Sequence, residues 1–122
     1  MQLRKNRNYG RRFVTMFAET MNQISTLDRP AGYHRILWHL LSVLDATQWR
    51  KVSAPEMCRA TGMAIATVQR ALLQLQADRV ILADGNTAAR ALKLNNRLAW
   101  QSSAEKWNAA EADPEIVDGR GR

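Results

Sequence analysis

The chain has little of what marks a secreted, membrane or metal-binding protein. Its 122 residues include one cysteine, Cys58, so no internal disulfide can form. No apolar run approaches the roughly 18 residues of a membrane span, and the first residues lack the apolar stretch of a signal peptide. His34 and His39 give no metal-ligand spacing with Cys58. We therefore expect a soluble, cytoplasmic protein with no metal, no cofactor and no membrane contact.

The sequence also lacks the short motifs of common enzymes. It contains no nucleophile elbow, no glycine-rich phosphate loop and no zinc-deaminase motif. The 11 acidic residues are scattered or lie in the C-terminal tail, so no carboxylate cluster is available for acid-base catalysis. We expect a protein that is not an enzyme.

Positive charge is what the chain has in excess. Its 18 Lys and Arg against 11 Asp and Glu give a net charge of +7 and a pI near 10.5, which favours a polyanionic partner. Residues 13–102 carry a net charge of +4 and residues 103–122 one of −2. We expect a basic, DNA-binding arm at residues 1–12, made of Arg4, Lys5, Arg7, Arg11 and Arg12. A solvated terminus without a partner is the alternative.

Hydrophobic spacing predicts two helices in the first third of the chain. Five apolar residues at helical steps predict the first helix, over residues 13–24: Phe13, Met16, Phe17, Met21 and Ile24. Pro30 and Gly32 should then interrupt helical structure. A second helix, central to the core, is expected over residues 33–45 with the apolar stripe Tyr33, Ile36, Leu37, Leu40, Leu41 and Leu44.

A short helix and a longer helix are predicted next, after a small strand at residues 50–52. Ser53 and Glu56 form a capping box that begins the short helix. Gly62 allows the positive φ of a tight turn, and the longer helix should span residues 64–77. Its apolar stripe is expected to comprise Ile65, Val68, Leu72 and Leu75.

The last third of the chain predicts a β-hairpin and a final helix. Residues 80–83 are β-prone, and residues 90–94 alternate so that Leu92 and Leu94 share one face and Lys93 takes the other. These two runs flank the turn signal at residues 84–87. A second capping box begins a helix over residues 102–112, and the Pro, Gly and charge content predicts a flexible tail over residues 113–122.

This order of elements is that of a winged helix-turn-helix, a mainly α fold with a small β-hairpin, here over residues 13–101. In such folds the second helix of the pair enters the DNA major groove and the hairpin reaches an adjacent phosphate or minor groove. Rotation about the helix over 64–77 predicts the groove-facing side chains Ala66, Thr67, Gln69, Arg70 and Gln74. Asn86 and Arg90 are the expected contacts from the hairpin.

Two segments resemble known families. Residues 57–75 resemble the helix-turn-helix of bacterial regulators, in which Gly opens the turn and Thr-Val-x-Arg-x-Leu-x-x-Leu fills the recognition helix. The run LKLNNRLAW at residues 92–100 resembles RepL-type plasmid replication and maintenance proteins, although Asn96 stands where their motif has Pro. The resemblance covers roughly residues 13–103. It implies binding of double-stranded DNA in plasmid or mobile-element replication, or in control of the genes for it.

The sequence leaves two other functions open. One is a transcriptional repressor or regulator of the winged-helix type, and the other, disfavoured by the positive charge, is a winged helix that binds a protein. We expect Trp38 and Trp49 to pack in or near the core. Homodimerisation is expected through the first and last helices, by way of Phe13, Phe17, Trp100 and Trp107. The alternative for Trp100 and Trp107 is that they cap the core.

Overall fold

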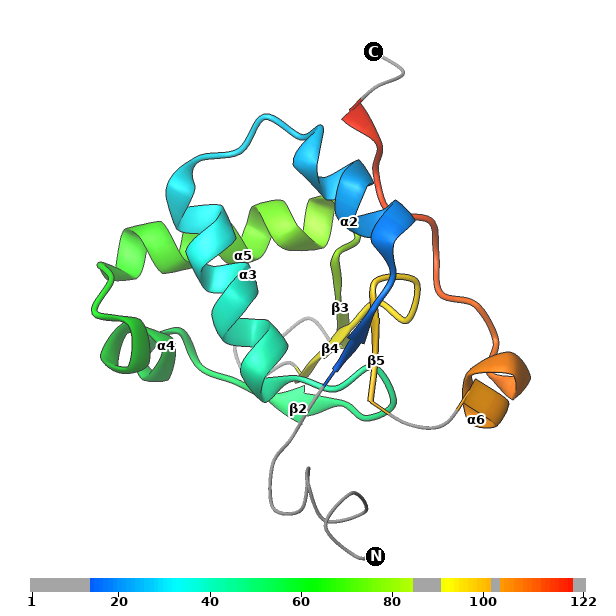
Figure 1. Cartoon of the computed structure of the whole chain (residues 1–122). Helices are drawn as coiled ribbons and strands as arrows, with labels where there is room; N and C mark the ends of the chain where they lie inside the picture. The colour runs from blue at the N-terminus through cyan, green and yellow to red at the C-terminus, as the bar shows by residue number, and fades with distance from the viewer. Residues whose placement is uncertain (1–13, 85–90, 102–103, 120–122) are drawn as a thin grey trace, which may run out of the picture.

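The computed structural model describes residues 14–84, 91–101 and 104–119 (Figure 1). The helices in these ranges are α2 (Ala18–Ser25), α3 (Ala31–Val43), α4 (Ala54–Thr61), α5 (Ile65–Ala77) and α6 (Ala104–Ala109). The strands are β1 (Thr15–Met16), β2 (Arg50–Lys51), β3 (Ile81–Asp84), β4 (Ala91–Leu94) and β5 (Ala99–Trp100). The expectation of helices with a small hairpin is thus confirmed. None of the described helices is long and apolar enough to cross a membrane.

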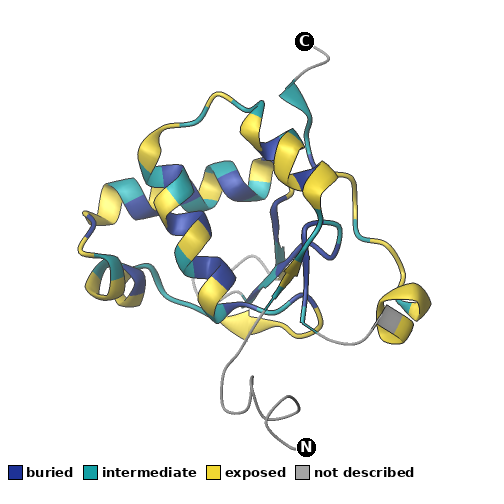
Figure 2. Cartoon of the chain, in the orientation of Figure 1, coloured by how far each residue is buried: buried dark blue, intermediate teal, exposed yellow. Residues whose placement is uncertain are grey.

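Helix α3 lies at the centre of the hydrophobic core (Figure 2). The six residues of its predicted apolar stripe are all buried. The helix begins at Ala31, two residues before the predicted start, with Pro30 as its N-cap. Proline does not break the helix there, because the N–H that it lacks would have no helical partner at this position.

The first predicted helix is wrong over residues 14–17, while Phe13 lies outside the described residues. Thr15 and Met16 form β1, which pairs antiparallel with β5 so that Thr15 lies opposite Trp100 and Met16 opposite Ala99. The backbone N–H of Phe17 donates to the carbonyl of Leu98, and α2 begins only at Ala18. Local spacing does not reveal this pairing because the partner strand lies near the other end of the sequence.

The predicted hairpin belongs to a three-stranded antiparallel sheet with the order β2, β4, β3. The short strand β2 pairs with β4, with Arg50 opposite Leu92. Leu92 and Leu94 are buried, which confirms the predicted alternation along β4. Asp84 pairs with Ala91 and ends β3 instead of lying in the turn.

Helices α4 and α5 follow the predicted pattern closely. The Ser53 Oγ accepts from the Glu56 N–H at 3.2 Å, as predicted. The Glu56 carboxylate accepts from the Ser53 hydroxyl at 3.1 Å, where a capping box has the Ser53 N–H as the donor. Gly62 ends α4 with a φ of 74°, in the left-handed region that glycine adopts without strain. Helix α5 begins after a turn of three residues, at Ile65.

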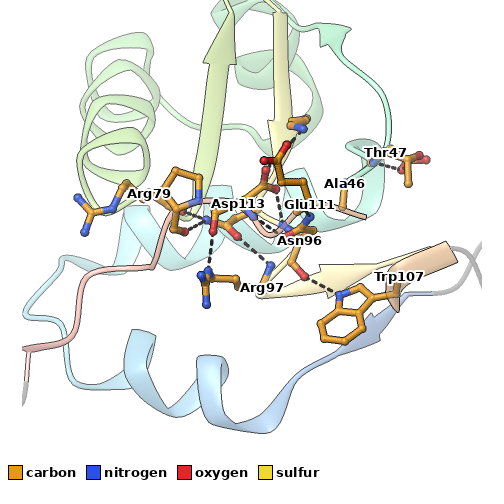
Figure 3. Close-up of polar contacts among 12 residues, drawn as sticks. Ala46, Thr47, Arg79, Asn96, Arg97, Trp107, Glu111 and Asp113 are labelled. Atoms are coloured by element: carbon orange, nitrogen blue, oxygen red, sulfur yellow. Dashed lines mark hydrogen bonds and ion pairs between the residues drawn. The ribbon is translucent and has the colours of Figure 1, made fainter. Parts of the chain in front are cut away.

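The C-terminal segment 111–119, here named the C-terminal strap, packs on the domain (Figure 3). Asn96 and Asp113 hold it through a reciprocal pair of bonds: the Asn96 N–H donates to Asp113 Oδ2 at 2.8 Å, and the Asp113 N–H donates to Asn96 Oδ1 at 3.0 Å. Ile116 is buried in the core. The prediction of a flexible tail is therefore wrong for residues 113–119.

The tryptophans also depart from expectation. Trp38 and Trp49, expected in the core, are 64% and 45% exposed. Trp100 is buried, and the ring of Trp107 lies 5.2 Å from that of Phe17 in the same chain, measured between centroids. Trp100 and Phe17 therefore offer little free surface to the interface that the sequence suggested.

Candidate nucleic-acid interface

Helix α5 buries one face and exposes another. Val68, Ala71 and Leu75 are buried in the core, where α5 packs on α3. The exposed side, here named the α5 stripe, comprises Ala66, Gln69, Arg70, Leu73 and Ala77. The structure thus places Ala66, Gln69 and Arg70 on the surface, as the helical rotation predicted.

The polar groups of the α5 stripe are available to a partner. The side chains of Gln69 and Arg70 make no hydrogen bond or ion pair with any residue that the structure describes. Arg70 is the sole charged residue of α5. Because no carboxylate lies on this helix, the stripe presents hydrogen-bond donors and positive charge without a repulsive group for an approaching phosphate.

Leu73 lies in the middle of the stripe and is 63% exposed. This agrees with the sequence interpretation of Leu73 as an outward-facing apolar residue that could contact a thymine methyl or a partner chain. Ile65 is also exposed, so its expected place in the buried stripe was wrong. As the first residue of α5, Ile65 lies beside the turn from α4 and not over the core.

Thr67 and Gln74 lie on the side of the helix that faces α3, and both are half-buried. Both line a small pocket of about 50 Å³ beside the N-terminus of α3, and Arg70 lines it as well. A Cβ built on Gly32 would lie 2.7 Å from the Thr67 methyl, so the two helices approach closely here. Within the described residues, the buried Gln74 Oε1 has no hydrogen-bond partner. These two candidates border the α3 contact and are less accessible than Gln69 and Arg70.

The C-terminus of α5 is closed by a Schellman motif. The Arg79 N–H donates to the Gln76 carbonyl and the Val80 N–H to the Leu75 carbonyl, both at 3.0 Å. Arg79 occupies the left-handed position, with a φ of 62°, a conformation that glycine adopts with less strain. A non-glycine residue there costs about 1 to 2 kcal/mol. Arg79 compensates by donating through Nε to the carbonyl of Glu115 in the C-terminal strap.

A buried acid joins the end of α5 to the start of α3. Asp78 is 2% exposed and accepts from Arg29 through both carboxylate oxygens, at 2.7 and 2.9 Å, and from the Tyr33 hydroxyl at 2.8 Å. The hydrogen bond to Asp78 raises the pKa of Arg29. Burial, and then the bond to Asp78, raises the pKa of Tyr33 above its ordinary value. The Arg29 charge offsets the unfavourable position of a carboxylate at a helix C-terminus.

Further positive charge is exposed outside α5, on β2 and on α4. Arg50 and Lys51 of β2 are both exposed, as is Arg59 of α4. The N-terminus of α5 has Ala64 as its N-cap and no side-chain cap. Its first N–H groups can therefore donate to an anion, because a helix N-terminus favours negative charge. The other candidates lie outside the described residues: Arg4, Lys5, Arg7, Arg11, Arg12, Asn86 and Arg90.

Comparisons with protein-family models, with curated proteins and with solved structures found no match to this chain.

Proposed function

We propose that the chain is a sequence-specific, double-stranded DNA-binding protein of the winged helix-turn-helix type. The observation that carries the proposal is the α5 stripe, in which Gln69 and Arg70 are exposed and have no described partner. The helix that presents them is held by α3 along its buried face and by Asp78 and the C-terminal strap at its end. Side chains on a rigid helix suit the precise geometry of base recognition.

The arrangement of elements supports the finer description of the fold. Helix α3, strand β2, the pair α4 and α5, and the strands β3 and β4 follow one another in the order of a winged helix. Strands β2, β4 and β3 form one sheet, which supports the interpretation of β3 and β4 as the strands of a wing. In this reading α5 enters the major groove and α4 lies across the DNA backbone.

The α5 stripe offers chemistry that distinguishes bases. Arg70 suits the O6 and N7 acceptors of guanine, and Gln69 suits the N6 and N7 groups of adenine. Leu73 supplies an apolar contact of the kind that recognises the thymine methyl. The basic residues of β2, of α4 and of segment 1–12 would neutralise phosphates and set the orientation.

The biological setting follows from the resemblance of residues 92–100 to RepL-type proteins. We infer that the protein acts in the cytoplasm in plasmid or mobile-element replication or maintenance, or in control of the genes for it. A winged helix that binds a protein instead would have no need of the excess positive charge in segments 1–12 and 50–59.

The proposal is tested by selecting binding sites from a random-sequence duplex pool with the full chain, followed by affinity measurements over a salt series. We expect one sequence to be enriched, and a log affinity that falls linearly with log salt. Deleting residues 1–12 should flatten that slope by roughly 0.9 for each phosphate that the arm neutralises. Failure to enrich any sequence, together with no retention at low salt, would favour a protein-binding role.

A further inference from the structure

A groove of about 180 Å³ lies between α2 and α3. Apolar side chains make most of its wall: Met16, Ile24, Leu37, Leu41 and Leu98. The polar side chains that line it are those of Ser25 and His34, and no Lys, Arg, Asp or Glu takes part. An occupant of this groove must therefore be apolar and uncharged, since a buried charge would have no counterpart.

Two large apolar side chains border the same groove and extend into solvent. Trp38 of α3 is 64% exposed and Met21 of α2 is 43% exposed. Both belong to helices whose other large apolar residues are mostly buried (Figure 2). One surface thus combines a projecting indole with an apolar hollow beside it.

We propose that this surface is the interface of a homodimer, in which Trp38 of each chain inserts into the groove of the other. A two-fold symmetric interface uses the same patch on both copies, so the patch must be complementary to itself. A projection and a hollow on one surface meet that requirement. A closed apolar cavity of roughly 150 Å³ is enough for a benzene ring. Tryptophan is also the side chain that most often dominates the energy of an interface.

The position of the groove is compatible with the rest of the molecule. Helix α5 packs against α3 through its buried face, and its stripe points away from that contact. The groove is lined by residues of α2 and α3, together with Met16 and Leu98, and by none of α5. A dimer formed there leaves both α5 stripes free. Dimerisation through this groove does not depend on what the stripe binds.

Sedimentation equilibrium of the full chain at micromolar concentration, without DNA, tests the proposal. The unmodified chain should have twice the chain mass of 13.8 kDa. Trp38→Ala should halve that mass, because it removes the projecting side chain. Ser25→Arg should also halve it, because Ser25 lines the groove and the substitution places a charge where the indole inserts.

Trp49→Ala is the matched control. Trp49 is also exposed, yet it lies over the Lys93 ammonium, 4.9 Å from the ring centroid, and does not line the groove. This variant should remain a dimer. Urea unfolding of each variant verifies that it is folded, and both Trp38 and Ser25 are exposed positions where substitution leaves the core intact. A single-chain mass for the unmodified protein overturns the proposal, as does a dimer that survives both groove substitutions.

Discussion

Gly32, in the first turn of α3, lies so close to Thr67 of α5 that a Cβ added to the glycine would be 2.7 Å from the threonine methyl. Real Cβ atoms do not approach a carbon so closely, so any larger residue at this position must displace one helix or rotate the Thr67 side chain. The contact fixes how α5 sits on α3, and through it the direction of the α5 stripe.

Gly32→Ala should therefore lower the free energy of unfolding by about 1 to 2 kcal/mol. Overpacking costs about 1 to 3 kcal/mol, and the better helix propensity of alanine returns up to about 1 kcal/mol. In a Thr67→Ser background, which removes the methyl but keeps the hydroxyl, the same change should be neutral or stabilising. Urea unfolding of the four proteins gives the coupling energy. Equal effects of Gly32→Ala in both backgrounds would contradict the close contact.

Asp78 should be the most sensitive polar position of the core. Asp78→Ala leaves the Arg29 guanidinium and the buried Tyr33 hydroxyl without their shared acceptor. We expect a loss of about 3 kcal/mol in the free energy of unfolding, as when one partner of a buried ion pair is removed. Tyr33→Phe, which removes one hydrogen bond to a charged group, should cost about 1.5 to 3 kcal/mol and no more than Asp78→Ala. A larger loss of stability for Tyr33→Phe than for Asp78→Ala would show that Asp78 is not the central acceptor for Arg29 and Tyr33.

The raised pKa of Tyr33 predicts a loss of stability in alkali. Below the ordinary tyrosine pKa of 10.0 the hydroxyl keeps its proton in both states, so the contribution of Tyr33 is complete. Above that pH the unfolded chain releases the proton and the folded chain keeps it, so stability falls with pH. The slope for one proton is about 1.4 kcal/mol per pH unit. Urea unfolding above pH 10 should show this extra slope in the unmodified protein and not in Tyr33→Phe, whereas parallel pH profiles would contradict the shift.

We expect Leu73 to contact the methyl group of a thymine in the preferred site. Once a preferred site is known, each thymine can be replaced by uracil, which removes the methyl group and keeps the base pairing. We expect one replacement to weaken binding by the unmodified protein and to leave binding by Leu73→Ala unchanged. If no uracil substitution separates the two proteins, Leu73 contacts something other than a thymine. The role of Arg70 and Gln69 would be unaffected by that result.

Sequence reasoning predicted the parts of the fold that depend on local chemistry. The apolar stripe of α3, the Ser53 cap, the Gly62 turn and the alternation of Leu92 and Leu94 follow from spacing and from single-residue preferences. For the same reason, the outward position of Gln69 and Arg70 on α5 could be predicted.

The parts that sequence reasoning missed depend on contacts between distant segments. Strand β1 pairs with β5, which lies near the other end of the sequence, and the C-terminal strap is held by distant residues, among them Asn95 and Asn96, which bind its backbone. The apolar pair Ile116-Val117 in an otherwise polar tail could have indicated that this segment packs on the domain. Trp38 was predicted wrongly for a different reason. Its position on α3 lies outside the apolar stripe, which indicates exposure, whereas its large apolar side chain favoured a place in the core.

The central claim is that Arg70 of the α5 stripe reads a base, and the affinity of Arg70→Ala for selected and for random duplex DNA tests it most directly. At one fixed salt concentration, we expect a loss of about 1 to 3 kcal/mol on the selected site and a much smaller loss on random DNA. Arg59→Ala, on α4, should weaken binding to both duplexes by similar factors, as removal of a phosphate contact does. Equal losses for Arg70→Ala on both duplexes would make Arg70 a phosphate contact, and no loss on either would contradict the proposed interface.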